Sequence, residues 1–116
     1  MDNLFKEKSQ KIRIILAMEQ ETDPYEHTVD FIELPSFPIS AIVTDLTATK
    51  AQYAMPGISV DSAKEIIIEK KYESLLLKSY RIKIRNDYFV GWIQNGKLQY
   101  RIEGDYLRAY VYIEKV

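Results

Sequence analysis

The one histidine is the first residue of this sequence that suggests catalysis. His27 follows Glu26 and lies four residues after Asp23. An imidazole beside carboxylates can serve as a general base or a metal ligand, but a zinc site built on histidines needs more than one of them. A Ser-His-Asp triad needs a serine in a nucleophile-type turn, and no serine of this chain has that sequence context. We interpret His27 as a solvated turn residue and predict no metal site.

Other catalytic patterns are also lacking in the sequence. The four glycines, at positions 57, 91, 96 and 104, form no phosphate-binding loop. The chain has no cysteine, which excludes disulfides, thiol catalysis and Cys-ligated metals and fits a reducing compartment. No pair among the 17 Asp and Glu residues stands out in an apolar setting. We therefore predict no catalytic residues, no enzyme activity and no cofactor.

Nucleic-acid binding is the second chemistry that the sequence suggests. Arg81, Lys83 and Arg85 alternate with apolar residues, so we expect them on one face of a strand. With Trp92 and tyrosines nearby, they would form a groove of cations and stacking rings for a single strand, or face double-stranded DNA. The alternative is a solvated outer strand face, which the acidic residues of the same region favour. A net charge of −1 argues against tight, non-specific DNA binding.

Tyrosine is unusually frequent, with nine in 116 residues. In the last segment, 106–113, alternation places Tyr106, Tyr110 and Tyr112 on one face and aliphatic residues on the other. Such a strand is either covered on both faces within its own chain or packs against a partner. Tyrosine is enriched at protein interfaces. We therefore take Trp92 and these three tyrosines as candidate interface aromatics.

The segment 47–62 (TATKAQYAMPGISVDS) is too long for a hairpin turn and shows no clear period. Long ordered loops in compact domains are usually functional. One interpretation is a bent finger that contacts a neighbouring subunit or a channel. The alternative is that the loop folds back and covers one end of the fold. Its candidate contact residues are Lys50, Tyr53, Met55, Pro56, Gly57 and Ile58.

Short apolar alternations between turn residues predict the elements that would position these side chains. We expect strands over 11–19, 28–34, 39–46, 64–70, 80–84, 88–94, 97–103 and 106–113, and a helical turn near 72–78. The predicted fold is mainly β, a small barrel or sandwich of about six to seven antiparallel strands with one long loop and at most a short helix. Residues 1–10 would be an N-terminal arm, and 11–116 a single β-barrel domain.

The dipeptide Asn95-Gly96 predicts a type I′ turn, because both residues accept a positive φ. That turn pairs Ile93 with Leu98, and the same register extended would place Gly91 opposite Tyr100 and Phe89 opposite Ile102. At the other end of the chain, the first 18 residues carry mixed charge and only a short apolar run. They resemble neither a signal peptide nor a membrane span, so we expect use or assembly in the cytoplasm and no membrane partner.

The order of segments resembles the small head-to-tail connector proteins of tailed bacteriophages, of the head-completion or stopper type. The resemblance covers roughly 11–113. It lies in ISAIVTDL (39–46), the long loop, KEIIIEK (64–70), LLLKSYRIKIRNDYFVGW (75–92) and NGKLQYRIEGDYLRAYVYI (95–113). The similarity is one of pattern and spacing, and the N-terminal portion departs most, since DPYEHTV has no tryptophan where the family pattern suggests one.

The resemblance implies a structural virion protein, assembled in the host cytoplasm. Its barrels would form a homo-oligomeric ring, expected to be a dodecamer, beneath the portal. The ring would retain packaged DNA, contact double-stranded DNA transiently, and bind portal or adaptor and tail proteins. The loop at 47–62 would point to the channel or to a neighbour. A tail terminator and a small nucleic-acid-binding β-barrel module are the alternative functions.

Overall fold

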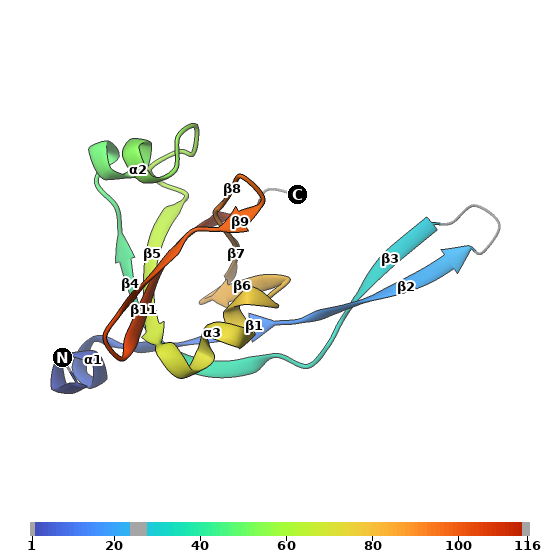
Figure 1. Cartoon of the computed structure of the whole chain (residues 1–116), viewed down its shortest axis with the longest axis horizontal. Helices are drawn as coiled ribbons and strands as arrows, with labels where there is room; N and C mark the ends of the chain where they lie inside the picture. The colour runs from blue at the N-terminus through green and yellow to red at the C-terminus, as the bar shows by residue number, and fades with distance from the viewer. Residues whose placement is uncertain (1, 24–27, 115–116) are drawn as a thin grey trace.

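The structure is a computed structural model that describes residues 2–23 and 28–114. It contains eleven strands and four short helical segments in the described ranges (Figure 1). The strands are β1 Gln10–Ile15, β2 Ala17–Asp23, β3 Thr28–Glu33, β4 Phe37–Asp45, β5 Ala63–Glu69, β6 Arg81–Ile84, β7 Asp87–Gly91, β8 Ile93–Gln94, β9 Lys97–Leu98, β10 Tyr100–Glu103 and β11 Tyr106–Ile113. The helices are α1 Asp2–Lys8, α2 Ala48–Ala54, the 3-10 turn η1 Lys70–Tyr72 and α3 Glu73–Leu77.

Six antiparallel strands close into a barrel, which confirms the predicted mainly β fold. Their order is β11, β5, β4, β1, β6 and β7, and β7 pairs with β11 to complete the circle. β10 adds to β11 as an extra strand. Closure leaves few exposed strand edges, so the barrel wall is stable without a partner sheet.

Alternate residues of each barrel strand fill the interior, because successive side chains of a strand point to opposite faces. The largest buried side chains include Ile12, Ile14, Ile66, Ile68, Ile82, Phe89, Leu107 and Val111. The β-branched run 66–68 suits β5, where one face lines the barrel and the other is covered from outside. The helical turn predicted after this strand is η1 with α3, and its Leu76 is buried in the same core.

The hairpin predicted around Asn95-Gly96 is confirmed at its turn and corrected further along. Asn95 and Gly96 have φ of 55° and 76°, and Ile93 pairs with Leu98. Beyond Trp92 the two strands separate, so Gly91 pairs with Val111 and Tyr100 pairs with Ala109 instead of with each other. The reason is β11, whose one edge offers backbone partners to β10 along its first half and to β7 along its second.

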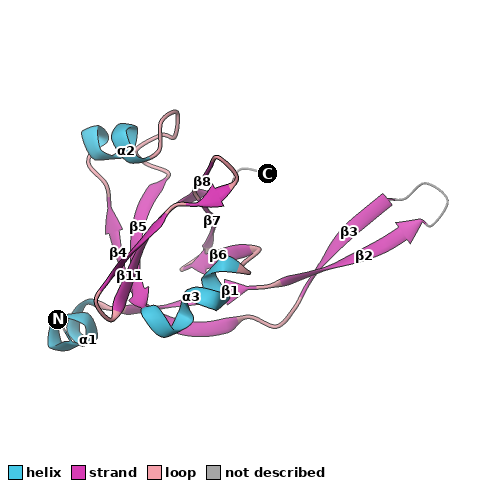
Figure 2. Ribbon diagram, viewed as in Figure 1, coloured by secondary structure: helices cyan, strands magenta, loops and turns pink. Residues whose placement is uncertain are grey.

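Three short helices lie at separate places around the barrel, where the sequence predicted at most one (Figure 2). Within the segment 1–10, expected to be an arm, Asp2–Lys8 form α1 and Gln10 begins β1. Phe5 of α1 is buried, and its ring centroid lies 5.0 Å from that of Tyr106. The helix α2 lies within the segment 47–62 and is described with the candidate site below.

A two-stranded hairpin, β2 with β3, projects far from the barrel (Figure 1). We call it the projecting hairpin. The strand predicted over 11–19 starts in the barrel as β1, is interrupted at Leu16 and continues outward as β2. The molecule therefore measures 53 × 29 × 26 Å, with a radius of gyration of 15.3 Å. A compact chain of this length has a radius of gyration of about 13 Å.

Candidate functional site

The segment 47–62 folds back onto the barrel and does not form a free finger. The Thr47 hydroxyl accepts a hydrogen bond from the Lys50 backbone N–H at 3.2 Å and so caps α2. Ala51 and Met55, four residues apart on one face of this segment, are both buried, and Met55 is 0% exposed. The covering interpretation is therefore correct, and the expected role of Met55 in an exposed contact tip is wrong.

The remaining loop residues divide between packing and exposure. Ile58 is half-buried against the same cluster, whereas Tyr53 is 90% exposed. Pro56 and Gly57 are exposed, and Gly57 has a φ of 87° that favours glycine. Of the six predicted contact residues, Tyr53 thus keeps the most free apolar surface.

The aromatic residues of β11 and Trp92 pack within their own chain. Trp92, Tyr110 and Tyr112 border a second apolar cluster under α2, built on Leu46, Ala51, Met55 and Ala63. The Trp92 and Tyr112 rings meet edge to face, with centroids 5.9 Å apart. Tyr106 packs against Phe5 of α1. The tyrosine face of β11 is therefore covered by the chain itself, in part, and these rings are half-buried without a partner protein.

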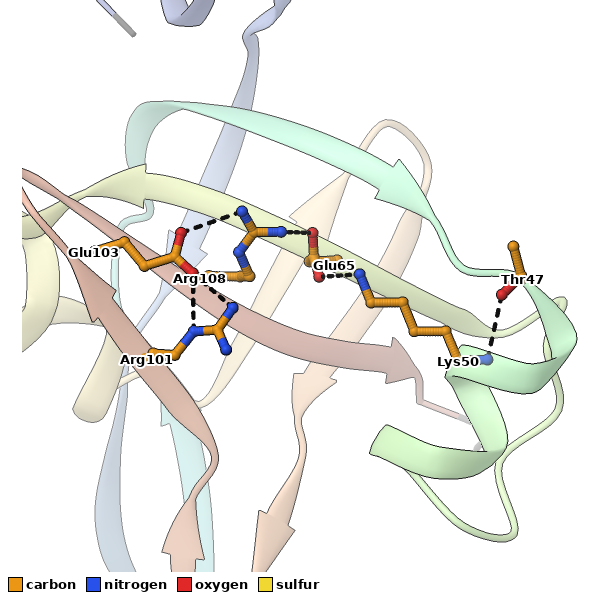
Figure 3. A network of polar contacts seen from close by, with 6 residues as sticks. All are labelled: Thr47, Lys50, Glu65, Arg101, Glu103 and Arg108. Atoms are coloured by element: carbon orange, nitrogen blue, oxygen red, sulfur yellow. Dashed lines mark hydrogen bonds and ion pairs between the residues drawn. The ribbon is translucent and has the colours of Figure 1, made fainter.

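A network of ion pairs joins α2 to the outer wall of the barrel (Figure 3). Its centre is Glu65 of β5, which is only 3% exposed. Arg108 donates to one carboxylate oxygen of Glu65 at 2.6 Å, and the Lys50 ammonium lies 3.2 Å from the other. Lys50, predicted to face a subunit or channel, forms an ion pair within its own chain and joins α2 to β5.

The outer end of this network is Glu103, which Arg101 and Arg108 both contact. Hydrogen bonds from Arg108 and then Arg101 lower the pKa of Glu103. Burial opposes the charge of Arg108, but attraction by Glu65 and the contact with Glu103 outweigh it and raise the pKa of Arg108. Each of the two carboxylates is held between two cations, so the network has the properties of a structural clamp and not of an acid–base site.

The three cations predicted to face DNA lie in different environments. Arg81 forms an ion pair with Glu33 and lies over the Tyr88 ring, 4.0 Å from its centroid. Lys83 points outward from β6, and its ammonium lies 5.7 Å from the same ring. Arg85 does not share their strand face, because it lies in the turn after β6 with a φ of 57°.

The structure adds two cations that the sequence analysis missed. Lys11 and Arg13 lie on the outer face of β1, since Ile12 and Ile14 fill the core. Arg13 is directly opposite Lys83 across the β1–β6 pair. We call Lys11, Arg13 and Lys83 the cationic strip. The alternation KIRI at 11–14 was a visible signal, but the pairing of β1 with β6 joins segments almost 70 residues apart.

No carboxylate pairs with any member of the cationic strip among the described residues. Lys11 donates to the Ser40 hydroxyl at 3.0 Å, and Arg13 donates to the Ser36 hydroxyl at 2.9 Å. Like charges directly opposite each other in a sheet are destabilising, by a few tenths of a kcal/mol to about 1 kcal/mol. The strip is therefore a surface that favours an anionic partner.

The projecting hairpin has two different faces. Phe31 stacks on Tyr80 with ring centroids 5.3 Å apart, and Glu33 pairs with Arg81, so one face is tied to the barrel near its base. On the other face the register places Leu16 opposite Leu34 and Met18 opposite Ile32. Met18 is 51% exposed, and Ile32 and Leu34 are also exposed. Met18, Ile32 and Leu34 form an apolar face without cover, whereas Leu16 beside them is partly buried against the barrel core.

Metal and membrane sites were searched over the same described ranges. No group of three or more His, Cys, Asp or Glu side chains there could hold a metal ion. His27 lies outside the described residues. None of the helices described is long and apolar enough to cross a membrane.

Comparison with known proteins gives no further guide to the function. No protein-family model, no curated protein and no solved structure matches this chain. The function is therefore argued from its surfaces.

Proposed function

We propose that the protein is a structural subunit of the head-to-tail connector of a tailed bacteriophage, of the head-completion or stopper type. Its copies form a ring beneath the portal, retain packaged DNA and present a surface for tail attachment. The observation that carries the proposal is the projecting hairpin, whose apolar face stays open on a barrel that is otherwise closed. The resemblance of 11–113 to this class supports the same assignment.

The shape of the subunit suits assembly better than catalysis or capture of a small molecule. An isolated two-stranded hairpin is marginally stable in water, so a hairpin of this length needs a surface to pack on. The chain itself supplies such a surface at the base, through Tyr80 and Arg81. Further out, the hairpin needs a neighbouring protein in the particle.

Co-sedimentation with the portal tests the proposal. Purified protein is mixed with portal rings encoded by the same genome and centrifuged, and the bound subunits are counted per portal. The proposal predicts saturable binding with several copies on each portal. Binding only to isolated tail tubes would instead identify a tail terminator, and binding to neither would refute the connector assignment.

A nucleic-acid-binding barrel is the second candidate, and the cationic strip is the observation that favours it. Two residues that such a site was expected to use are already engaged, since Arg81 pairs with Glu33 and Trp92 packs beneath α2. The strip with Tyr88 would remain as the binding surface. This candidate predicts binding to an oligonucleotide that weakens steeply with salt and on Lys83→Glu. Absence of binding at low salt would eliminate it.

A further inference from the structure

The projecting hairpin is acidic, and the rest of the chain is basic. Residues 17–33 contain six Asp and Glu and no Lys or Arg. The remaining chain holds all 16 Lys and Arg with 11 Asp and Glu. Its formal net charge is therefore +5, and that of residues 17–33 is −6. The overall charge of −1 hides this separation.

Two carboxylates of the hairpin have no cation partner among the described residues. Glu19 and Asp30 are exposed, and neither is part of an ion pair. Glu33, nearer the barrel, does reach a cation of its own chain, Arg81. Glu19 and Asp30 lie further out along the hairpin than Glu33, so the cations that could match them belong to another molecule.

The exposed area is larger than that of a compact monomer of the same mass. A compact monomer of 13.6 kDa exposes about 6,600 Å². This chain exposes 7895 Å². The excess of about 1,300 Å² exceeds the roughly 800 Å² that each partner contributes to a stable protein–protein interface. The elongated chain thus exposes enough surface to form one.

We propose that the projecting hairpin of one copy docks on the cationic strip of the next copy. The occupant is a second copy of this chain because the charges are complementary: Asp30 lies on the Met18 face of the hairpin and faces Arg13 and Lys83. Glu19 lies on the opposite face and adds to the negative potential of the hairpin. The apolar face around Met18 packs on the aliphatic stems of the strip and on the Tyr88 ring. This contact specifies how neighbouring subunits of the proposed ring meet, and it rests on the proposed function.

The contact is head-to-tail, because the hairpin and the strip are different surfaces of one molecule. Each copy then uses its hairpin on one neighbour and its strip on the other. A contact of this kind closes into a ring if the rotation per subunit allows it, and otherwise forms a filament.

Charge reversal tests the contact. The hairpin variant E19K/D30K and the strip variant R13E/K83E are compared with the wild type by sedimentation velocity in about 0.05 M NaCl. Each variant alone is expected to associate roughly 100-fold more weakly, since reversal places like charges together at the contact. A 1:1 mixture restores assembly as alternating subunits, and so does the chain that carries all four changes.

Exposed charges elsewhere provide matched controls. The variants K78E/K97E and D61K/D105K make the same changes in net charge away from both surfaces and are expected to assemble like the wild type. Circular dichroism establishes that every variant is folded.

The outcomes separate the contact from the proposed function. If reversal leaves assembly unchanged, or the mixture fails to restore it, the contact is wrong and portal binding still tests the connector assignment. A wild type that stays monomeric also overturns the contact. If R13E/K83E instead abolishes binding to a double-stranded DNA probe while the wild type is monomeric, the strip is a nucleic-acid surface.

Discussion

Replacing Met55 by alanine tests whether α2 is part of the folded core or a detachable finger. Met55 is fully buried in the second apolar cluster, beside Ala51, Ala63 and Trp92. Truncating a buried methionine to alanine costs about 2 to 5 kcal/mol. The cluster is small and lies outside the barrel, where it can partly collapse, so we expect about 2 to 3 kcal/mol.

Urea unfolding measures this loss. With a slope of about 1.5 kcal/mol per M for a chain of this size, the midpoint falls by roughly 1 to 2 M. Trp92 fluorescence reports the same event locally, because its ring borders the cluster. If α2 detaches before the barrel unfolds, the fluorescence changes at lower urea than the far-ultraviolet dichroism.

Tyr53→Ala is the matched control, since Tyr53 lies on α2, two residues before Met55, and is 90% exposed. Its free energy of unfolding is expected to lie within about 0.5 kcal/mol of that of the wild type. If Met55→Ala proves as mild as Tyr53→Ala, the packing of α2 on the barrel is refuted and the finger interpretation returns.

Three further predictions concern the barrel wall. Glu65→Ala leaves Arg108 without its main partner and is expected to lower the free energy of unfolding by about 3 kcal/mol. This is the low end for a broken buried ion pair, because Arg108 keeps its contact with Glu103. A fall in the urea midpoint no larger than that of Glu103→Ala would contradict this prediction. Glu103 has a lowered pKa, so its pairing stabilises fully above the ordinary value of 4.5 and is lost as the pH falls through the lower folded value. Glu103→Gln should therefore destabilise at pH 7 but differ little from the wild type at about pH 2, and a constant difference would refute this. Gly91→Ala places a Cβ 2.3 Å from Leu98 Cδ1, the end of a half-buried side chain that can turn away, so we expect a loss of at most about 1 kcal/mol that the double variant with Leu98→Ala reduces.

Local sequence patterns predicted most of the strands, because alternation over 80–84 or 106–113 is a property of neighbouring residues. Turn chemistry also succeeded at Asn95-Gly96. The missed helix α2 had a local signal too, in Thr47 as an N-cap and in Ala51 and Met55 on one face. The three consecutive β-branched residues of β5 correctly predicted a strand and not a helix. An uninterrupted apolar run suits this strand because both of its faces are covered.

Pairings between distant segments were not predictable in the same way. The register between Arg13 and Lys83, which creates the cationic strip, depends on barrel closure and not on either strand alone. The projecting hairpin was missed because its base reads as a continuous barrel strand across Leu16. Whether Met55 is buried or exposed could not be predicted for a related reason. A methionine suits both an exposed contact and a core, and only the position of α2 decides between them.

Negative-stain imaging of the protein bound to its portal tests the central proposal most directly. The account predicts a ring of barrels, coaxial with the portal, that adds a layer to the particle and is lost with E19K/D30K. Portals that carry no added ring at saturating protein, or single subunits bound without contact to each other, would contradict it.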